Sequence, residues 1–283
     1  MAQLAEIENR IASMGELKSI LGAMRALAVI RMQEARQALA GVRRYAEILA
    51  HGVGQATLLM DGQREFRGEG TGRIIVAFLS EHGFVGGFNA RLLDTVSKMH
   101  HTPAEFLVVG TRGAGIALER SLPLTWTQPM ATRIEGALET ARAVAGELYK
   151  RISCGTVGQV TLVYGQSRQA STPEPTRKSV LPLDLANLKH AANALTPIHH
   201  LKPAVLLERL VAEYIFAQLA EAAVEAQASE NAARFFAVEA ARDNVTKKLA
   251  QLRQDARQER QEDITNEIVE IVGGAEAVED APR

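Results

Sequence analysis

The chain has 283 residues, of which 47% are hydrophobic and 23% charged, enough for one large or two small globular domains. Its net charge of -1 gives no overall attraction to nucleic acid or to an acidic membrane surface. The lone cysteine, Cys154, rules out an internal disulfide or a C-x-x-C metal site and fits a reducing compartment. No apolar run approaches the roughly 20 residues that span a bilayer. The early acidic residues Glu6 and Glu8 argue against a signal or transit peptide, so we expect a cytoplasmic bacterial protein.

The first predicted element is a long helix, assigned to a domain of residues 1–57 and expected to persist to about His51. Its apolar residues recur every three or four positions, as in the seam of a coiled coil. The predicted seam consists of Leu4, Ile7, Ile11, Met14, Leu17, Leu21, Met24 and Ala28. Taken alone, this segment also fits an amphipathic helix that lies on a globular core.

A second domain, residues 72–200, changes to an alternating pattern of strands and helices after a polar, glycine-rich connection at residues 61–72. Strands are predicted at residues 73–80, 105–110 and 159–165, and helices at residues 89–99, 112–119 and 134–152. Residues 173–184 are predicted to form a loop that leads to a further strand. This alternation predicts a mainly parallel, doubly wound α/β sheet of modest size.

Two glycine-rich stretches in this domain resemble nucleotide-binding loops in composition. They read "SEHGFVGGFN" at residues 80–89 and "VVGTRGAGIALE" at residues 108–119. Neither has the G-x-G-x-x-G order of a dinucleotide fingerprint, and G-x-x-x-x-G-K-[ST] occurs nowhere in the chain. We therefore interpret their glycines as tight turns between strand and helix, with no nucleotide expected.

The remaining chemistry-bearing residues predict no catalytic group, cofactor or metal site. The adjacent histidines at 100–101 and 199–200 stand beside prolines in predicted loops, where two neighbours make a poor chelate. G-x-S-x-G is absent, and Cys154 has no evident activating partner nearby in sequence. A mechanical or structural role is therefore expected.

The third predicted domain is a helix over residues 203–274. Residues 204–272 contain neither proline nor glycine, and a helix of that length extends on the order of 100 Å, which requires a partner. Its apolar stripe consists of Val238, Ala241, Val245, Leu249, Leu252 and Ala256, resumed by Ile264, Ile268 and Ile271. We predict that it forms an antiparallel coiled coil with the first helix. The polar stretch at residues 253–263 is either a solvated face or a contact with an encircling partner.

Several stretches resemble the γ subunit of F-type ATP synthases over essentially the whole chain. The C-terminal stretches "ASENAARFFAVEAARDNVTKKL" and "ITNEIVEIVGGAEAV" resemble its last helix, and "EIENRIASM" and "AMRALAVIRMQEAR" resemble its first. The stretch "SEHGFVGGFN" is similar to a turn in that family's Rossmann-like domain. The resemblance implies a long antiparallel coiled coil of the terminal helices with an inserted Rossmann-like α/β domain.

The resemblance also implies a function and partners. In that family the subunit is the central rotor shaft, present in one copy inside a ring of three α and three β subunits. It rests on the membrane c-ring together with the ε subunit, at the cytoplasmic face of the bacterial plasma membrane. Ion flow turns the shaft, which couples that flow to ATP synthesis or hydrolysis at the β subunits. The coupling ion, H⁺ or Na⁺, is set in the membrane ring rather than in this chain.

Family positions transferred by alignment give expected partner-contact residues. The resemblance places Met24 at the lever region of a β subunit and places Arg234, Gln261, Thr265 and Glu267 at its catch loop. Arg260 lies beside that cluster. The chain departs from the family pattern at Val85, where a cysteine is usual, and its first helix has fewer lysines and hydroxyl residues. These departures suggest a divergent bacterial branch, such as that of an alternative ATP synthase.

Two other functions are compatible with the residues alone. One is a nucleotide-binding α/β protein with coiled-coil dimerisation arms, and the other is a static coiled-coil scaffold. Binding of ATP or NAD that depends on Gly86 or Gly113 would favour the first, whereas recovery of the chain within an ATPase would favour the shaft.

Overall fold

The computed structural model describes residues 2–60, 70–99, 104–167, 171–183, 188 and 198–279. The histidines at 100–101 and most of the predicted connection at 61–72 lie outside the described residues. Two compact units are formed, which we describe separately. The coil unit comprises residues 1–26 and 238–283, and the sheet unit comprises residues 27–237. Two long helices, α1 (Ala2–Leu58) and α6 (Pro203–Glu279), contribute residues to both units.

The sheet unit is built on five strands in the order β3-β2-β1-β4-β5. The strands are β1 (Gly72–Phe78), β2 (Glu105–Val109), β3 (Leu124–Gln128), β4 (Val157–Gln166) and β5 (Glu174–Leu181). The first four are parallel, and β5 runs antiparallel to β4 along one edge. The connecting helices are α2 (Phe88–Ser97), α3 (Thr111–Glu119) and α4 (Ala137–Ser153), the last preceded by the short 3₁₀-helix η1 (Ile134–Gly136). The predicted parallel α/β sheet is thus confirmed.

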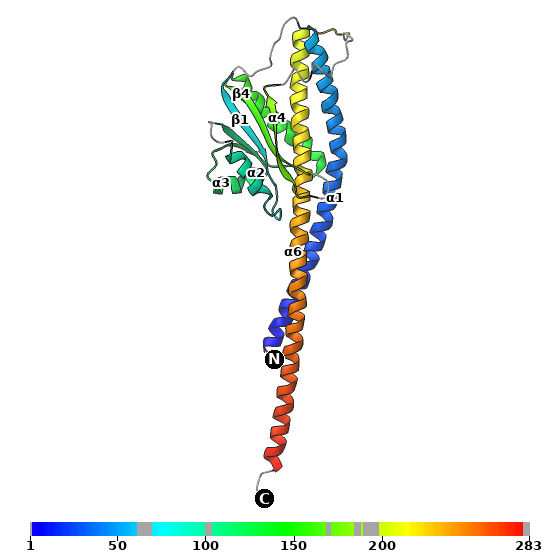
Figure 1. The fold of residues 1–283 in the computed structure, drawn as a ribbon, viewed down its shortest axis with the longest axis vertical. Coiled ribbons are helices and arrows are strands. Elements are labelled where there is room, and N and C mark those ends of the chain that lie inside the picture. The colour runs from blue at the N-terminus through cyan, green and yellow to red at the C-terminus, as the bar shows by residue number, and fades with distance from the viewer. Residues whose placement is uncertain are drawn as a thin grey trace. The chain divides into compact units, whose positions relative to one another are not determined.

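Each face of the sheet has its own core, because successive residues of β1 point to opposite sides. Ile74, Val76 and Phe78 pack with α4 and with apolar residues of α1 and α6. Ile75, Ala77 and Leu79 lie in the other core, which α2 and α3 cover. Figure 1 shows this layering, with α2 and α3 on one side of the strands and α4 on the other.

Within each unit α1 and α6 run antiparallel, as predicted. In the coil unit Gln3 Nε2 donates to Glu259 at 2.7 Å, while Arg25 pairs with Glu239. In the sheet unit Arg43 and Tyr45 of α1 pair with earlier residues of α6, namely Glu221 and Glu213. As the residue number increases along α1, the residue number of its partner on α6 decreases. The fold class, α/β with long terminal helices, is therefore confirmed.

The seam of α1 in the coil unit differs in one detail from the prediction. Leu17 is 40% exposed, and the half-buried position is held by Lys18. The spacing that alternates strictly between three and four residues from Leu4 leads to Lys18 and Arg25 rather than to Leu17 and Met24. A lysine can hold this position because its aliphatic stem packs while its ammonium group stays in water.

Three other elements also differ from the prediction. The first helix continues to Leu58, several residues beyond His51, since α1 there still packs Val53 and Ala56 into the sheet core. Strand β3, "LTWTQ", was missed because its alternating half-exposed pattern at the sheet edge gives a weak apolar signal. Residues 174–181, predicted as a loop, form β5, whose single proline, Pro175, and charged residues suit an edge strand.

Candidate functional site

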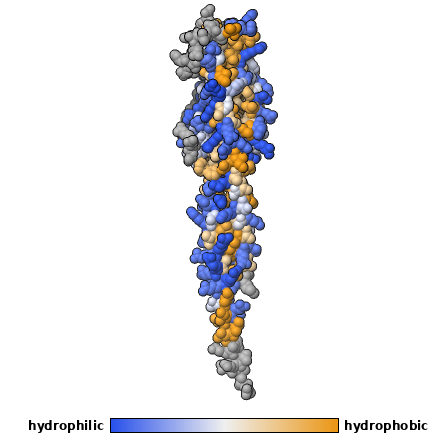
Figure 2. All heavy atoms as spheres, turned by 90° about the vertical axis from the view of Figure 1, so that its right-hand side faces the viewer, coloured by the Kyte–Doolittle hydropathy of each residue, from blue (hydrophilic) through white to orange (hydrophobic). Residues whose placement is uncertain are grey.

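The end of α6 in the coil unit has an exposed apolar surface. The pairs Gln3–Glu259 and Glu8–Arg260 place the beginning of α1 beside residues 259–260 of α6. Every residue from Ile264 to Val272 is exposed. The exposed apolar side chains are Ile264, Ile268, Val269, Ile271 and Val272, each more than half exposed. They appear in Figure 2 as the orange region near the end of the helix. Such a helix surface is typical of an interaction site.

The predicted partner-contact residues of this helix end are accessible. Gln261, Thr265 and Glu267 are all exposed, and the Thr265 hydroxyl donates to the Gln261 carbonyl at 2.8 Å, one turn earlier. Arg260 is also exposed and forms an ion pair with Glu8 at 2.7 Å. Met24 is half-buried on α1. The structure therefore gathers four of the six residues on one accessible segment and leaves their role as partner contacts a prediction.

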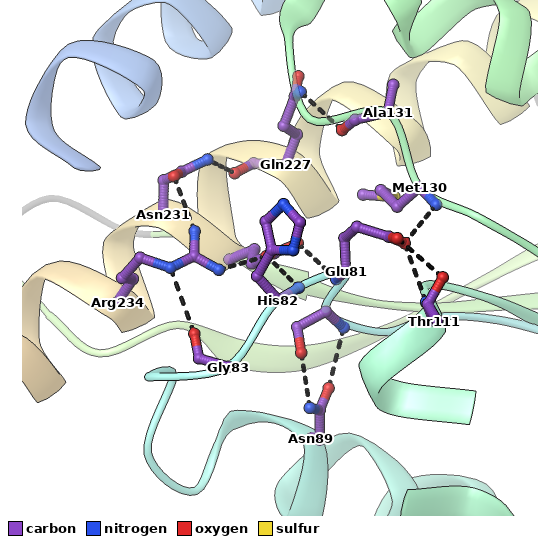
Figure 3. A network of polar contacts seen from close by, with 12 residues as sticks. Glu81, His82, Gly83, Asn89, Thr111, Met130, Ala131, Gln227, Asn231 and Arg234 are labelled. Carbon is purple, nitrogen blue, oxygen red and sulfur yellow. Dashed lines mark hydrogen bonds and ion pairs between the residues drawn. The ribbon is translucent and has the colours of Figure 1, made fainter. Parts of the chain in front are cut away.

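Arg234 differs from the others because it lies in the sheet unit and is only 7% exposed. Its guanidinium donates to Glu230 Oε1 at 2.5 Å, to Asn231 Oδ1 at 3.0 Å and to the Gly83 carbonyl at 3.3 Å. Figure 3 shows this fork reaching from α6 to the glycine loop. Within the chain, Arg234 holds the glycine loop that follows β1, the first strand of the α/β domain. Its role as a partner contact stays a prediction.

The glycine loop at residues 80–89 is held by two carboxylates of the chain itself. The backbone N–H groups of Glu81 and His82 donate to Glu230 of α6 at 3.0 and 3.2 Å. Glu81 in turn accepts from the backbone of Thr111 and Met130 and from the Thr111 hydroxyl, at 2.7–2.9 Å. These contacts are the dashed lines around Glu81 in Figure 3.

Those contacts bear on the nucleotide-binding alternative. Phosphate sites at helix N-termini depend on backbone N–H groups that point at the ligand. At the start of α3, the N–H of Thr111 donates to Glu81, that of Arg112 to the Glu81 carbonyl, and that of Gly113 to the Ser80 carbonyl. Since the chain's own acceptors occupy these donors, a phosphate would have to displace a carboxylate. The arrangement therefore favours the interpretation of the glycines at residues 110–115 as a tight turn between strand and helix rather than a phosphate site.

The glycines at this turn permit close packing. A Cβ on Gly113 would lie 2.1 Å from Cβ of Leu79, inside the sheet core. Gly110 has φ of +110°, and a Cβ there would lie 2.5 Å from the Leu79 carbonyl oxygen. Both positions require glycine because of the close approach of α3 to β1, as the tight-turn interpretation expects.

Glu81 illustrates the electrostatics of the network. Desolvation raises the pKa of the Glu81 carboxyl, but the hydrogen bonds from Thr111 and Met130 together outweigh it, so the pKa lies below its ordinary value. Glu225 of α6 shows the opposite balance. Burial raises its pKa even though Arg43 of α1 pairs with it at 2.8 Å. Glu225 therefore links the two long helices within the sheet unit at a cost in desolvation.

The sequence analysis missed Phe84 as a candidate site residue. It sits at the tip of the glycine loop, is 65% exposed and has φ of +59°. A bulky residue in the left-handed region is strained, and such strain concentrates at functional sites. The only available signal in the sequence was an aromatic residue among the glycines of "HGFVGG". Phe84 is thus an exposed apolar side chain of the sheet unit that its strained backbone marks as a candidate for partner contact.

Two further kinds of site are absent from the described part of the chain. Among these residues no group of three or more His, Cys, Asp or Glu side chains is placed to hold a metal ion. Nor does any helix among them combine the length and hydropathy needed to cross a bilayer.

Comparison with known proteins gives a consistent family. The family model described as ATP synthase matches residues 3–278. The ATP synthase gamma chain of Gluconobacter oxydans is 28% identical, and the alignment covers 98% of this chain and 100% of the relative. Among solved structures, a chain of the Euglena gracilis mitochondrial ATP synthase (OSCP/F1/c-ring) matches with a TM-score of 0.69 at 15% identity, covering 100% of this chain and 97% of that one. A chain of the Tetrahymena thermophila mitochondrial ATP synthase, from a structure of its central stalk and c-ring, matches with a TM-score of 0.56 at 19% identity, covering 78% and 99%.

At these identities the solved structures establish the fold, and the family assignment rests on the sequence match. Because that match extends over nearly the whole length of the chain, the chain belongs to the ATP synthase family, and its full-length relatives are gamma chains.

Proposed function

We propose that the chain is the central rotor shaft of an F-type ATP synthase, which couples ion flow through a membrane rotor ring to ATP synthesis or hydrolysis at β subunits. The observation that carries the proposal is the pairing of two long helices, one of which continues with an exposed apolar surface from Ile264 to Val272. A helix with such a surface is suited to insertion among partner subunits. Since its relatives are named ATP synthase gamma chains, we take those partners to be other subunits of an ATP synthase.

The paired helices fit a load-bearing role. Each elementary charge that crosses the membrane contributes roughly 2.3 kcal/mol per 100 mV. Several ions per ATP therefore deliver energies comparable to the stability of a whole domain, about 5–15 kcal/mol. Two helices joined along a seam resist bending better than one. In this chain the seam is reinforced by ion pairs such as Arg25–Glu239 and Arg43–Glu225.

Within this function we assign the coupling contacts to the accessible residues of α6. Arg260, Gln261, Thr265 and Glu267 present charged and hydrogen-bonding groups beside the exposed isoleucines, which suits orientation-dependent contact with a β subunit. Met24 is assigned to the β-subunit contact on α1. Arg234 is assigned to positioning the glycine loop, in addition to any contact that it makes with a β subunit. Exposed Phe84 adds an apolar contact from the sheet unit.

The remaining partners follow from the same proposal. One copy of the chain would stand within an α3β3 ring and meet the ε subunit and the c-ring. It would be a peripheral subunit at the cytoplasmic face of a bacterial plasma membrane. The solved relatives support the F1 and c-ring partners, since they come from structures named for F1, the central stalk and the c-ring.

Affinity purification of the tagged chain from its native membranes tests the proposal. We expect recovery of an ATPase that contains α and β subunits. Gln261→Leu should then lower coupled ATP turnover, whereas the matched control Gln254→Leu, an exposed glutamine of the same helix outside the assigned set, should not. Recovery of the chain without α and β subunits under mild conditions would contradict the proposed function. Equal turnover in the two variants would remove Gln261 from the contact set.

A further inference from the structure

In the sheet unit, helix α6 crosses the carboxyl ends of two adjacent strands. Near the end of β4, the Ser229 hydroxyl donates to the Gly165 carbonyl at 2.6 Å. A Cβ on Gly165 would lie 3.0 Å from Cβ of Ser229, so the glycine permits the helix to approach the strand closely. Beyond the end of β1, Glu230 accepts from the N–H groups of Glu81 and His82. Neighbouring residues of α6 are therefore bonded to the ends of β4 and β1.

These two strand ends lie where the order of the strands reverses. The chain proceeds from β1 to β2 and β3 and then returns to the other side of β1 as β4. Helices α2 and α3 cover one face of the sheet and α4 covers the other, as Figure 1 shows. In open α/β sheets, ligands bind outside the carboxyl ends of the strands at such a reversal. In this chain α6 lies at that position.

Three donors converge on the Glu230 carboxylate. The backbone nitrogens of Glu81 and His82 lie 3.0 and 3.2 Å from its oxygens, and the Arg234 guanidinium lies 2.5 Å from Oε1. Glu230 is only 4% exposed, so these bonds replace those that the carboxylate would make with water. Successive backbone N–H groups in a turn, together with a guanidinium, are groups with which proteins bind carboxylates and phosphates.

We propose that the N–H groups of Glu81 and His82 and the guanidinium of Arg234 form an oxyanion site, and that α6 supplies the ligand of this site as Glu230. The site takes one carboxylate, and its built-in occupant locks α6 across the carboxyl ends of β1 and β4. It follows that the donors should still bind a free carboxylate when the Glu230 side chain is removed. The lock itself does not depend on the proposed shaft function.

The covalent connection explains why the chain's own side chain occupies the site. A helix packed on the sheet holds the Glu230 carboxylate beside its donors, which gives it a high effective concentration and leaves it little freedom to lose on binding. A dissolved carboxylate or phosphate at millimolar concentration should therefore not displace it. The Glu81 carboxylate does not compete for the site, because it accepts from Thr111 and Met130.

The lock has a mechanical consequence that does rest on the proposed shaft function. In a rotating shaft, the load acts on the attachment of the α/β domain to α6. Charge-assisted hydrogen bonds are roughly twice as strong as neutral ones. Because Glu230 and Ser229 are bonded to the ends of two different strands, they would oppose rotation of the sheet about the helix axis.

Chemical rescue of the isolated full-length chain tests the oxyanion site. Glu230→Ala removes Cγ and the carboxyl group, which together correspond to acetate. Acetate that binds only the folded variant lowers its unfolding equilibrium constant by the factor 1 + [acetate]/Kd, about elevenfold at ten times the Kd. We expect this dependence in urea titrations of Glu230→Ala, compared with sodium chloride at equal ionic strength. An equal effect of acetate and chloride on this variant would overturn the oxyanion site.

Two proteins serve as controls for the rescue. The unchanged chain keeps its own carboxylate in the site, and Glu230→Gln fills the site with an amide of the same shape. Neither should be stabilised by acetate more than by chloride. Stabilisation of the unchanged chain by acetate to the same extent as Glu230→Ala would show that acetate acts elsewhere, and would also overturn the site.

Hydrogen exchange of Glu230→Gln keeps the inference testable if Glu230→Ala does not fold. We expect the amides of Glu81 and His82 to exchange at least tenfold faster than in the unchanged chain, because the variant lacks the negative charge and one of the two acceptor oxygens. The amide of Gly113, which donates to the Ser80 carbonyl, is the matched control and should keep its rate. Unchanged exchange at Glu81 and His82, or equally faster exchange at Gly113, would contradict the lock. Both measurements use the chain without partners, so they test the lock whether or not the shaft function holds.

Discussion

Helix α6 uses its charged residues in opposite ways in the two units. In the sheet unit Glu225, Glu230 and Arg234 are nearly buried, and each is bonded to another element of the same chain. In the coil unit Arg253 and Arg257 are exposed and lie beside a groove. The same residue types on one helix therefore serve the fold in one region and are available to partners in the other.

This difference teaches how to interpret polar positions on a long helix. A buried charge must be paired, because an unpaired one costs several kcal/mol, so its partners identify the neighbouring elements of the fold. An exposed charge is nearly neutral for stability and is free to serve binding. Substitutions in the two regions should consequently separate effects on stability from effects on assembly.

The largest expected effect distinguishes Arg234 from Arg257. Arg234→Ala should lower the free energy of unfolding by about 3–5 kcal/mol, because it leaves the buried Glu230 carboxylate without its cation. Arg257→Ala should change it by no more than about 0.5 kcal/mol. Urea unfolding of the full chain, followed by circular dichroism, measures both values. Equal destabilisation by the two variants would break the distinction between inward and outward charges.

A second substitution tests the close packing behind the glycine loop. Gly113→Ala should lower the free energy of unfolding by about 1–3 kcal/mol, because its Cβ would lie 2.1 Å from Cβ of Leu79 and force α3 away from β1. Gly115→Ala is the matched control on the same helix, since a Cβ there meets nothing within 4 Å. The same urea titration compares the two variants. A control as destabilised as Gly113→Ala would show that helix α3 tolerates neither change for some reason other than packing.

The sequence predicted the long helices and the parallel sheet because both depend on local signals. Residues 204–272 lack proline and glycine, and the strands "RIIVAF" and "EFLVV" are each continuously apolar after a charged first residue. Edge strand β3 was not predicted from the sequence, because one of its faces is exposed to solvent and carries threonines. The Glu230–Glu81 network was equally invisible, since it joins residues about 150 positions apart and no periodicity encodes that contact. For the accessible end of α6, the residues alone left two interpretations of the polar stretch at 253–263, a solvated face or a partner contact, and the family resemblance added the individual positions.

The pH dependence of the free energy of unfolding tests the role of the Glu81 carboxylate in the Glu230–Glu81 network. Because the folded-state pKa of Glu81 is lowered, its carboxylate contributes stability that is present above the unfolded pKa, about 4.3, and is lost as pH falls through the folded value. Glu81→Gln should cost about 1.5 kcal/mol at neutral pH, through weaker hydrogen bonds to Thr111 and Met130. The difference between the two proteins should shrink below about pH 4. Urea midpoints measured from pH 3 to pH 7 check this, and a constant difference would contradict the role assigned to the carboxylate.

The smallest expected effect concerns the Glu8–Arg260 pair in the coil unit. Glu8→Gln should change the free energy of unfolding by less than about 1 kcal/mol, since both side chains are more than half exposed. Glu6→Gln, on the same helix, is the matched control, since Glu6 is also exposed and forms an ion pair with Arg10 one turn away. Urea unfolding of both variants measures these changes, and a large loss of stability in Glu8→Gln would place Glu8 among the charges that hold the fold.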